Sequence, residues 1–332
     1  MAEPTTSEKG LDDLLASGLP SGSVTKKIPI DLAGERLDRA AANLFPEYSR
    51  SRIQLWIDNG ALLIDGQAGK RRQPVAEGMK LSLTITTEPQ GDWQPQPIEF
   101  PVVYEDEHIL VIDKPAGLVV HPGAGNIDCT LLNGLLHRYP DLAEVPRAGI
   151  VHRLDKDTSG LMVVARNLAA QNHLVQQLQS RSVTRLYQAI VMGGPTASGC
   201  INAPIGRNPK NRLKMAVVRN GKEAITHYRV LSSFRAHKLL QLKLETGRTH
   251  QIRVHLAHNN WPIVGDQLYA GKSRLPKGCS TELRSLLEGF SRQALHAVQL
   301  ELIHPASGQH CAWQSELTAD IQKILVELQS DV

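Results

Sequence analysis

The sequence predicts an α+β protein, in which a large domain built on a mixed, mainly antiparallel sheet follows a small N-terminal α/β unit. After residue 100, strand-like runs outnumber helical segments, and the helices lie between the strands. The glycine fingerprint of a doubly wound dinucleotide fold is missing, because no third glycine opens a helix after Gly123-Ala-Gly125. A proline-rich stretch separates the two parts of the chain.

Length and composition are those of an ordinary globular protein. The chain has 332 residues, of which 41% are apolar, enough for one large domain and one small one. No run reaches the roughly 20 apolar residues of a membrane helix, and the first residues are acidic without a signal-peptide core. We therefore expect a cytoplasmic protein without a membrane partner. The four cysteines form no Cys-x-x-Cys pair and are expected to be small buried hydrophobes.

The chain divides into four segments. Residues 1–27 lack a sustained apolar period and are predicted to be a disordered tail. Residues 28–88 form the small unit, with helices expected at 36–45 and 49–57, the second capped by Ser49, and strands at 61–67 and 78–85. Residues 89–100 are predicted to be a linker with little that could pack, and 101–332 the large domain.

The elements of the large domain follow from their apolar patterns. Strands are expected from residue 102 to Lys114, at 118–120 and at 161–165, and later at 185–191, 224–231 and 238–244. Helices are expected at 131–138, 169–181, 248–257 and 283–290.

A short polar loop around Asp155 is the strongest candidate for chemistry. It lies in Gly149-Ile-Val-His-Arg-Leu-Asp-Lys-Asp-Thr-Ser-Gly160, between two apolar runs that hold both of its ends. His152 and Arg153 can orient the carboxylate and bind an anionic substrate. A solvated hairpin turn is one alternative for this composition. A calcium loop is another, but Arg166 stands where an EF-hand requires a bidentate glutamate.

Positive charge is concentrated in one part of the chain. The net charge is +4, yet the segment from Pro204 to Arg253 holds twelve Lys or Arg against Glu223 and Glu245, an excess of ten. The rest of the chain therefore sums to −6, as 4 minus 10. Such a region suits a polyphosphate partner, and a solvated basic face is the alternative.

Thirteen histidines invite a metal hypothesis. His250, His255 and His258 are the densest group, but their spacings of five and three do not match a helical His-x-x-x-His pair and no suitable glutamate follows. We therefore predict no metal and no cofactor.

The small unit carries cations near the start of its second helix, an unfavourable place for them unless they face a ligand. With Arg36-Leu-Asp38, Ser49-Arg-Ser51, Asn59-Gly60 and Asp65-Gly66, the segment resembles the S4 RNA-binding domain over about 60 residues. The resemblance implies an RNA-binding surface, and the cations expected to form it are Arg50, Arg52, Lys70, Arg71 and Arg72.

Four motifs extend the resemblance over nearly the whole chain. They are Val111-Ile-Asp-Lys-Pro-Ala-Gly117, His152-Arg-Leu-Asp-Lys-Asp-Thr-Ser-Gly160, Tyr187 after Thr184-Arg185, and Leu244-Glu-Thr-Gly-Arg-Thr-His-Gln-Ile-Arg-Val-His255. The chain resembles the RluA family of pseudouridine synthases, and within it the RluD group that acts on large-subunit ribosomal RNA. That activity breaks the C1′–N1 bond of uridine, turns the base and rejoins it through C5, which needs no redox step.

The resemblance implies roles for individual residues. Asp155 is the nucleophile or base at the sugar, Tyr187 stacks on the uracil, and Arg253 keeps the carboxylate ionised and aimed. Arg153 fills the gap left by the flipped uridine. Whether Asp155 attacks C1′ or removes a sugar proton stays open, and so does a core role for Tyr187. Expected to shape the cleft are Lys114, Pro115, Gly117 and His152, and expected to bind RNA are Arg207, Lys210 and Arg212.

The implied partner is large-subunit (23S) ribosomal RNA in a pre-ribosomal particle, with the helix 69 stem-loop as the expected target of a monomeric enzyme. Two alternatives remain. One is a synthase for another ribosomal site or for transfer RNA, since target choice depends on RNA shape and phosphate contacts. The other is an S4-type protein that binds RNA without catalysis.

Overall fold

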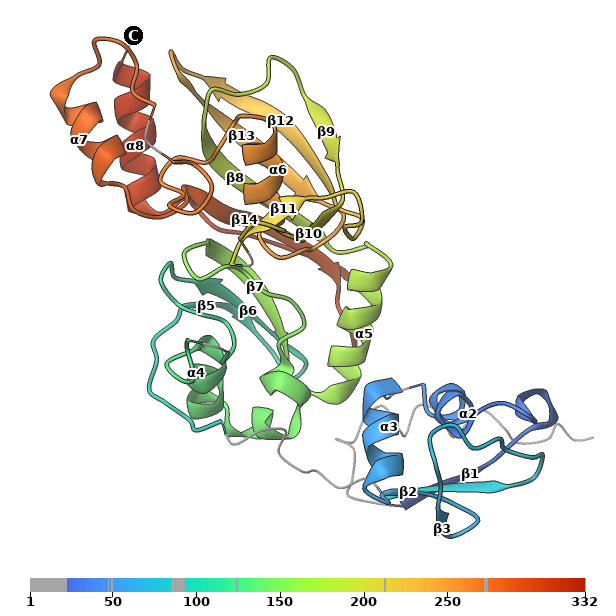
Figure 1. The fold of residues 1–332 in the computed structure, drawn as a ribbon. Helices are drawn as coiled ribbons and strands as arrows, with labels where there is room; N and C mark the ends of the chain where they lie inside the picture. Colours follow the sequence, from blue (N-terminus) through green and yellow to red (C-terminus); the bar gives the residue numbers. More distant parts are fainter. Residues whose placement is uncertain are drawn as a thin grey trace, which may run out of the picture.

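The computed structural model describes residues 23–46, 48, 50–84, 93–123, 125–211, 213–271 and 274–331, except the side chain of Ser51. Within these residues the chain forms a small N-terminal unit and a large unit built on one extended sheet (Figure 1). The α+β class with a mixed, mainly antiparallel sheet is therefore confirmed. Residues 1–22 of the predicted tail and the predicted capping residue Ser49 lie outside the described residues.

The N-terminal unit packs two helices on a four-stranded sheet of order β1-β4-β2-β3. Residues Ser23–Lys27, which we predicted to belong to the disordered tail, instead form β1 and pair antiparallel with β4. The strand is polar and largely exposed, so its order comes from backbone hydrogen bonds that an apolar pattern cannot reveal. The elements are β1 (Ser23–Lys27), η1 (Ile30–Leu32), α2 (Leu37–Leu44), α3 (Arg50–Asp58), β2 (Leu62–Ile64), β3 (Gln67–Ala68) and β4 (Lys80–Thr84).

The described part of the predicted linker packs against the large unit. Phe100 is 4% exposed in the main core, and Trp93 packs against the same core. The N–H of Gln96 donates to the carbonyl of Asn133 (3.0 Å), and the Asn133 amide donates to the carbonyl of Gln94 (2.8 Å). The expectation that residues 89–100 have little to pack is therefore wrong from Trp93 onward, because two aromatic side chains lie among the prolines.

The large unit is organised by a nine-stranded sheet of order β5-β6-β7-β14-β8-β13-β12-β9, with β15 paired to β14. The β7–β14 pair is parallel and the other described pairs are antiparallel. The strands are β5 (Val102–Glu105), β6 (Ile109–Lys114), β7 (Ser159–Ala165), β8 (Thr184–Met192), β9 (Gly199–Asn202), β12 (Ile225–Ser233), β13 (His237–Leu244), β14 (Leu295–Ile303) and β15 (His310–Gln314). A separate hairpin joins β10 (Ile205–Arg207) to β11 (Met215–Val217).

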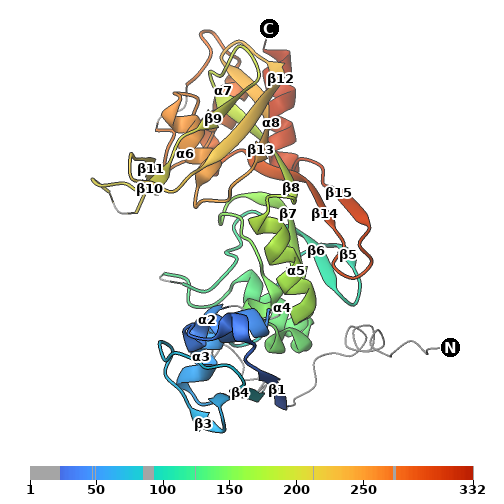
Figure 2. The same ribbon diagram turned by 90° about the vertical axis from the view of Figure 1, so that its right-hand side faces the viewer.

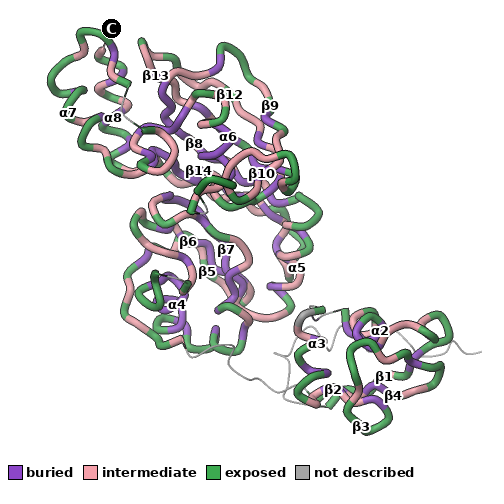
Figure 3. Tube along the Cα trace, viewed as in Figure 1, coloured by how far each residue is buried: buried purple, intermediate pink, exposed green. Residues whose placement is uncertain are grey.

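Helices flank this sheet. Helix α6 contacts β11 and β12, and α7 and α8 lie side by side at one end of the sheet (Figures 1 and 2). The helices are α4 (Leu131–Arg138), α5 (Leu168–Gln179), α6 (Gln251–His258), α7 (Thr281–Gly289) and α8 (Ala319–Ser330), with 3₁₀ turns η2 (Pro140–Glu144) and η3 (Pro146–Gly149). The third strand of the sheet, β7, is buried along its whole length, and its neighbour β14 is mostly buried (Figure 3). No helix in the described ranges is long and apolar enough to cross a membrane.

The cysteines are not the buried hydrophobes that we expected. Cys129 and Cys200 are exposed, and Cys279 and Cys311 are partly exposed. Cys200 lies on β9, an edge strand, where alternate side chains face solvent. The sequence pattern around a small residue does not show on which side of an edge strand it falls.

Candidate active site

The loop that carries Asp155 is held at both ends by close backbone contacts. Before it, Gly149 has a φ of 74°, and a Cβ there would overlap the carbonyl oxygen of Ala165. After it, Gly160 has a φ of 112°, and a Cβ there would overlap the backbone of Ala297 on β14. Glycine fits both positions because it has no Cβ and tolerates positive φ. Both ends of the loop are therefore held against strands of the sheet.

Lys114 clamps the same loop from β6. Its buried ammonium donates to the carbonyl oxygens of Pro115 (2.8 Å), Leu118 (2.9 Å) and Lys156 (3.0 Å). Burial lowers the pKa of Lys114 to about 7. Gly117, with a φ of 87°, donates its N–H to the same Lys156 carbonyl at 3.0 Å. These contacts fix the backbone next to Asp155. The predicted cleft-shaping residues 114, 115 and 117 do not themselves line the cavity described below.

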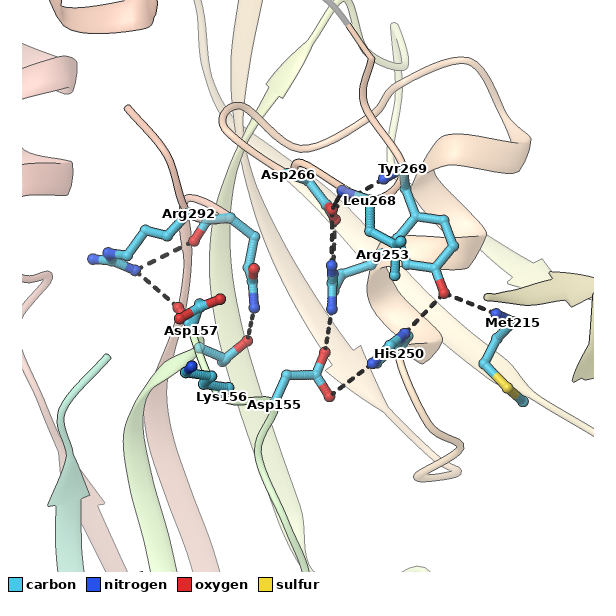
Figure 4. Close-up of polar contacts among 12 residues, drawn as sticks. Asp155, Lys156, Asp157, Met215, His250, Arg253, Asp266, Leu268, Tyr269 and Arg292 are labelled. Atoms are coloured by element: carbon cyan, nitrogen blue, oxygen red, sulfur yellow. Dashed lines mark hydrogen bonds and ion pairs between the residues drawn. The ribbon is translucent and has the colours of Figure 1, made fainter. Parts of the chain in front are cut away.

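The Asp155 carboxylate is hydrogen bonded through one of its two oxygens, and the other oxygen lies 3.9 Å from His250 Nε2 (Figure 4). Arg253 on α6 donates through Nη1 to Asp155 Oδ2 at 3.1 Å, and through Nε and Nη2 to the two oxygens of Asp266 at 2.7 and 2.8 Å. Asp266 has no exposed side-chain surface and raises the pKa of Arg253 against the opposing effect of burial. Oδ1 of Asp155 accepts no hydrogen bond from the described residues, so one carboxylate oxygen is left for chemistry.

Asp155 lies at a cavity of about 630 Å³. The cavity is lined by the loop before β7, by the turn before α6 and by side chains of β8, so three segments far apart in the sequence meet there. Its lining includes five of the predicted site residues, which are His152, Arg153, Asp155, Tyr187 and Arg253.

Two of the aromatic side chains that line the cavity are uncharged. Tyr187 on β8 is 5% exposed, and burial raises the pKa of its phenol. His152 accepts a hydrogen bond from the N–H of Val163 through Nε2 (3.1 Å), and desolvation lowers its pKa to about 3. Both rings are therefore neutral near pH 7. A flat neutral ring beside Asp155 offers a stacking surface for a planar base.

The rim and walls of the cavity are rich in arginine. Arg153 is exposed on the loop, while Arg185 on β8 is only 8% exposed and its Nε has no hydrogen-bond partner among the described residues. Arg185 stands two residues before Tyr187 and therefore on the same face of the strand. A buried guanidinium without a carboxylate partner favours an anionic ligand. The arginines that line the cavity are Arg147, Arg153, Arg181, Arg185, Arg248 and Arg253.

The predicted cations of the N-terminal unit are partly engaged within the unit itself. Arg50 donates to Asp38 Oδ2 at 2.8 Å, and Asp38 is completely buried. Burial raises the pKa of Asp38, but hydrogen bonds from Arg50, Gln54 and Arg36 outweigh this effect and lower it to about 2. A buried carboxylate therefore explains a cation at this helix start without a ligand, which corrects our reason for expecting one.

The other cations of this unit divide into two kinds. Arg71 forms a bidentate ion pair with Asp58, and the guanidinium of Arg52 lies 5.0 Å from the centre of the Trp56 ring. Lys70 and Arg72 are exposed and make no ion pair within the described residues. On the β10–β11 hairpin, the predicted RNA-binding residues Arg207 and Lys210 are exposed, and Arg212 lies outside the described residues.

The part of the chain that carries this site is similar to known proteins. A family model described as RNA pseudouridylate synthase matches residues 108–258, a span that includes Asp155, Tyr187 and Arg253. A protein of Pseudomonas aeruginosa called ribosomal large subunit pseudouridine synthase D is 57% identical over 305 residues, which are 92% of this chain and 95% of the relative. The chain belongs to the RNA pseudouridylate synthase family.

Further relatives extend the match over both units. A Xanthomonas campestris protein with the same name is 51% identical over 321 residues, 97% of each chain. The solved structure called human RNA pseudouridylate synthase domain containing 4 aligns with a TM-score of 0.52 at 30% identity, covering 69% of this chain and 93% of its own. The protein is therefore an RNA pseudouridine synthase, an isomerase.

The structure adds residues that sequence reasoning missed. Asp266 follows Gly265, whose φ is 75°, and holds Arg253 from 13 residues away. His250, considered only as a metal ligand, lies 3.9 Å from Asp155 Oδ1 and is hydrogen bonded to Tyr269. The only local signal was the Gly-Asp-x-x-Tyr spacing from Gly265 to Tyr269. Within the described ranges, no group of three His, Cys, Asp or Glu side chains is placed to hold a metal ion.

Proposed function

We propose that this pseudouridine synthase acts on specific uridines of large-subunit ribosomal RNA, with Asp155 as the nucleophile or base at the sugar. The observation that carries the proposal is the Asp155 carboxylate, held by Arg253 through Oδ2 while Oδ1 accepts no hydrogen bond from the described residues, in a cavity that Tyr187 also lines. The relatives named for the ribosomal large subunit cover 92 to 97% of this chain, which supports the substrate class.

The size and lining of the cavity suit the binding of a uridine nucleotide. Its volume of about 630 Å³ accommodates a nucleotide. Tyr187 would stack on the base and keep it near the sugar after the glycosidic bond breaks. Arg185 would bind a phosphate of the extruded nucleotide, and the exposed Arg153 would occupy the gap in the RNA stack. Asp155 needs no cofactor for either role that we assign to it.

The finer target that we propose is the helix 69 stem-loop, reached by a monomer on a pre-ribosomal particle in the cytoplasm. The N-terminal unit would act as an S4-like RNA-binding module, with the exposed Lys70 and Arg72 among the cations that contact RNA. The β10–β11 hairpin would supply a second set of phosphate contacts through Arg207 and Lys210.

Single-turnover release of tritium from RNA that carries 5-tritiated uridine tests the proposal, because rejoining through C5 releases that hydrogen. Large-subunit transcript, a helix 69 stem-loop and transfer RNA serve as parallel substrates. We expect release from the first two, and none with Asp155→Asn, which keeps the shape but removes the charge. Asp157→Asn makes the same change two residues later in the loop and should stay within a few-fold of the wild type.

The outcomes separate the alternatives. Release from transfer RNA alone would show a different substrate. Equal RNA binding by wild type and Asp155→Asn, with release by neither, would favour an RNA-binding protein without catalysis. Equal release by both would remove Asp155 from the reaction.

A further inference from the structure

The hairpin formed by β10 and β11 is fastened to the turn that precedes α7 at the edge of the active site. Lys214 donates through Nζ to the carbonyl oxygen of Leu268 at 2.6 Å. The N–H of Met215 donates to the hydroxyl of Tyr269 at 2.9 Å. Met215 also packs beside Tyr269 in a small apolar cluster. A movement of the hairpin therefore moves the Tyr269 hydroxyl.

That hydroxyl continues the chain toward the catalytic carboxylate (Figure 4). Tyr269 already accepts a hydrogen bond from Met215, and its oxygen lies 2.8 Å from Nδ1 of His250. We assign the hydroxyl as the donor to Nδ1, which is the acceptor within hydrogen-bond distance of it among the described residues. The remaining proton of the neutral ring is then on Nε2, which lies 3.9 Å from Oδ1 of Asp155.

Two further observations point to a specific role for His250. Burial lowers the pKa of its ring, so the neutral form is favoured. Its backbone is left-handed, with φ 56° and ψ 22°, directly before the first residue of α6. Such a conformation costs free energy for a residue other than glycine and is often found at functional sites. Here it turns the ring toward Asp155 from the helix that also carries Arg253.

We propose that Tyr269 and His250 are positioning residues that couple the hairpin to Asp155. This inference rests on the proposed function, because it assumes that the hairpin contacts RNA. When RNA presses the hairpin into place, the chain from Met215 through Tyr269 and His250 brings Nε2–H within hydrogen-bond distance of Oδ1. Catalytic hydrogen bonds are often long in free enzymes and tighten only in the complex, as the 3.9 Å separation requires. Asp155 is then fully oriented only when RNA is correctly seated.

The first test is independent of the substrate. Long-range proton–nitrogen correlation NMR on protein with ¹⁵N-labelled histidine should show His250 with its proton on Nε2, the signal being assigned by its loss in His250→Gln. Tyr269→Phe keeps the ring packing and removes the hydroxyl, so it should shift His250 to a mixture of tautomers. A proton on Nδ1 in the wild type, or no change in Tyr269→Phe, would overturn the chain of hydrogen bonds even if the RNA substrate were wrong.

The second test separates catalysis from binding. At saturating transcript, Tyr269→Phe should slow single-turnover tritium release about tenfold, with the RNA Kd within twofold of the wild type. His250→Gln should give a similar loss, and the double variant should be no slower than either single one, because both changes break one chain. Unchanged rates in the single variants would contradict the coupling, and so would a loss in the double variant equal to the product of the two single losses.

The contact between the hairpin and the turn at Leu268 is tested with Lys214→Met, which removes the hydrogen bond to the Leu268 carbonyl. We expect a slower rate at saturating RNA and no added loss in combination with Tyr269→Phe. Lys323→Met on α8 removes the same charge from an exposed position far from this contact and serves as the control. A Lys214→Met effect confined to the Kd would show that the hairpin binds RNA without acting on Asp155.

Discussion

Replacing Asp266 by asparagine tests whether a buried carboxylate holds together the group of residues that we propose for catalysis. In the wild type, Asp266 accepts hydrogen bonds from Arg253 Nε and Nη2 and from the N–H groups of Leu268 and Tyr269. Asparagine has one acceptor oxygen, so its NH₂ group would face an arginine donor. Removing one partner of a buried ion pair costs about 3–5 kcal/mol, and we expect about 3 kcal/mol because Arg253 keeps Asp155 as a partner.

Urea unfolding measures this loss as a lower midpoint with an unchanged m-value. The corresponding decrease in Tm is about 6–12 °C for a unit of this size. Asp320→Asn is a matched control, because Asp320 also forms a bidentate pair with an arginine, Arg292, but is 46% exposed. The free energy of unfolding of this variant should fall by less than about 1 kcal/mol.

The same substitution should also lower the rate of the reaction. With only one acceptor oxygen at position 266, the Arg253 side chain is held less firmly and no longer presents Nη1 to Asp155 in one geometry. A misplacement of about 1 Å can cost about a hundredfold in rate, so we expect a ten- to hundredfold slower single-turnover reaction at saturating RNA. A stability loss no larger than that of Asp320→Asn, together with a normal rate, would refute the view that Asp266 holds this site.

Three further predictions concern pH, the loop and RNA binding. Burial lowers the pKa of His237 to about 4, whereas the pKa in the unfolded chain is about 6.5. Between these two values the unfolded chain binds a proton that the folded chain does not. The free energy of unfolding therefore falls by about 1.4 kcal/mol for each unit that the pH decreases in this window. In urea unfolding at pH 7.5 and 5, His237→Gln should show a smaller acid loss than the wild type; an equal loss would count against a neutral buried ring. Gly160→Ala should destabilise by more than about 3 kcal/mol in thermal unfolding, because the backbone is left-handed and the Cβ overlaps Ala297, and a change within 1 kcal/mol would mean that the contact relaxes. The double change of Lys70 and Arg72 to alanine should reduce the slope of the logarithm of the RNA-binding constant against the logarithm of the salt concentration by about one to two. The reaction rate at saturating transcript should not change. An unchanged slope would show that this surface does not bind RNA.

The strands and helices with a strong apolar pattern could be predicted from the sequence. Leu161–Ala165 is continuously apolar and forms most of β7, which is buried along its whole length, and the helix predicted at 131–138 has the bounds of α4. The helix predicted from residue 248 begins instead at Gln251, because Arg248 to His250 form a turn that ends in a left-handed residue. Local periodicity reports which face of an element is buried, and it contains no information on such turns.

For the site, the sequence by itself determined which residues are suited to the chemistry, since Asp155, Tyr187 and Arg253 stand in recognisable motifs. Only the tertiary structure decided how they are held. Asp266 holds Arg253, His250 lies 3.9 Å from Asp155, and the buried Asp38 pairs with Arg50 of a neighbouring helix. Ion pairs and hydrogen bonds depend on distances of a few ångströms between atoms, and those distances exist only after strands far apart in the chain have paired.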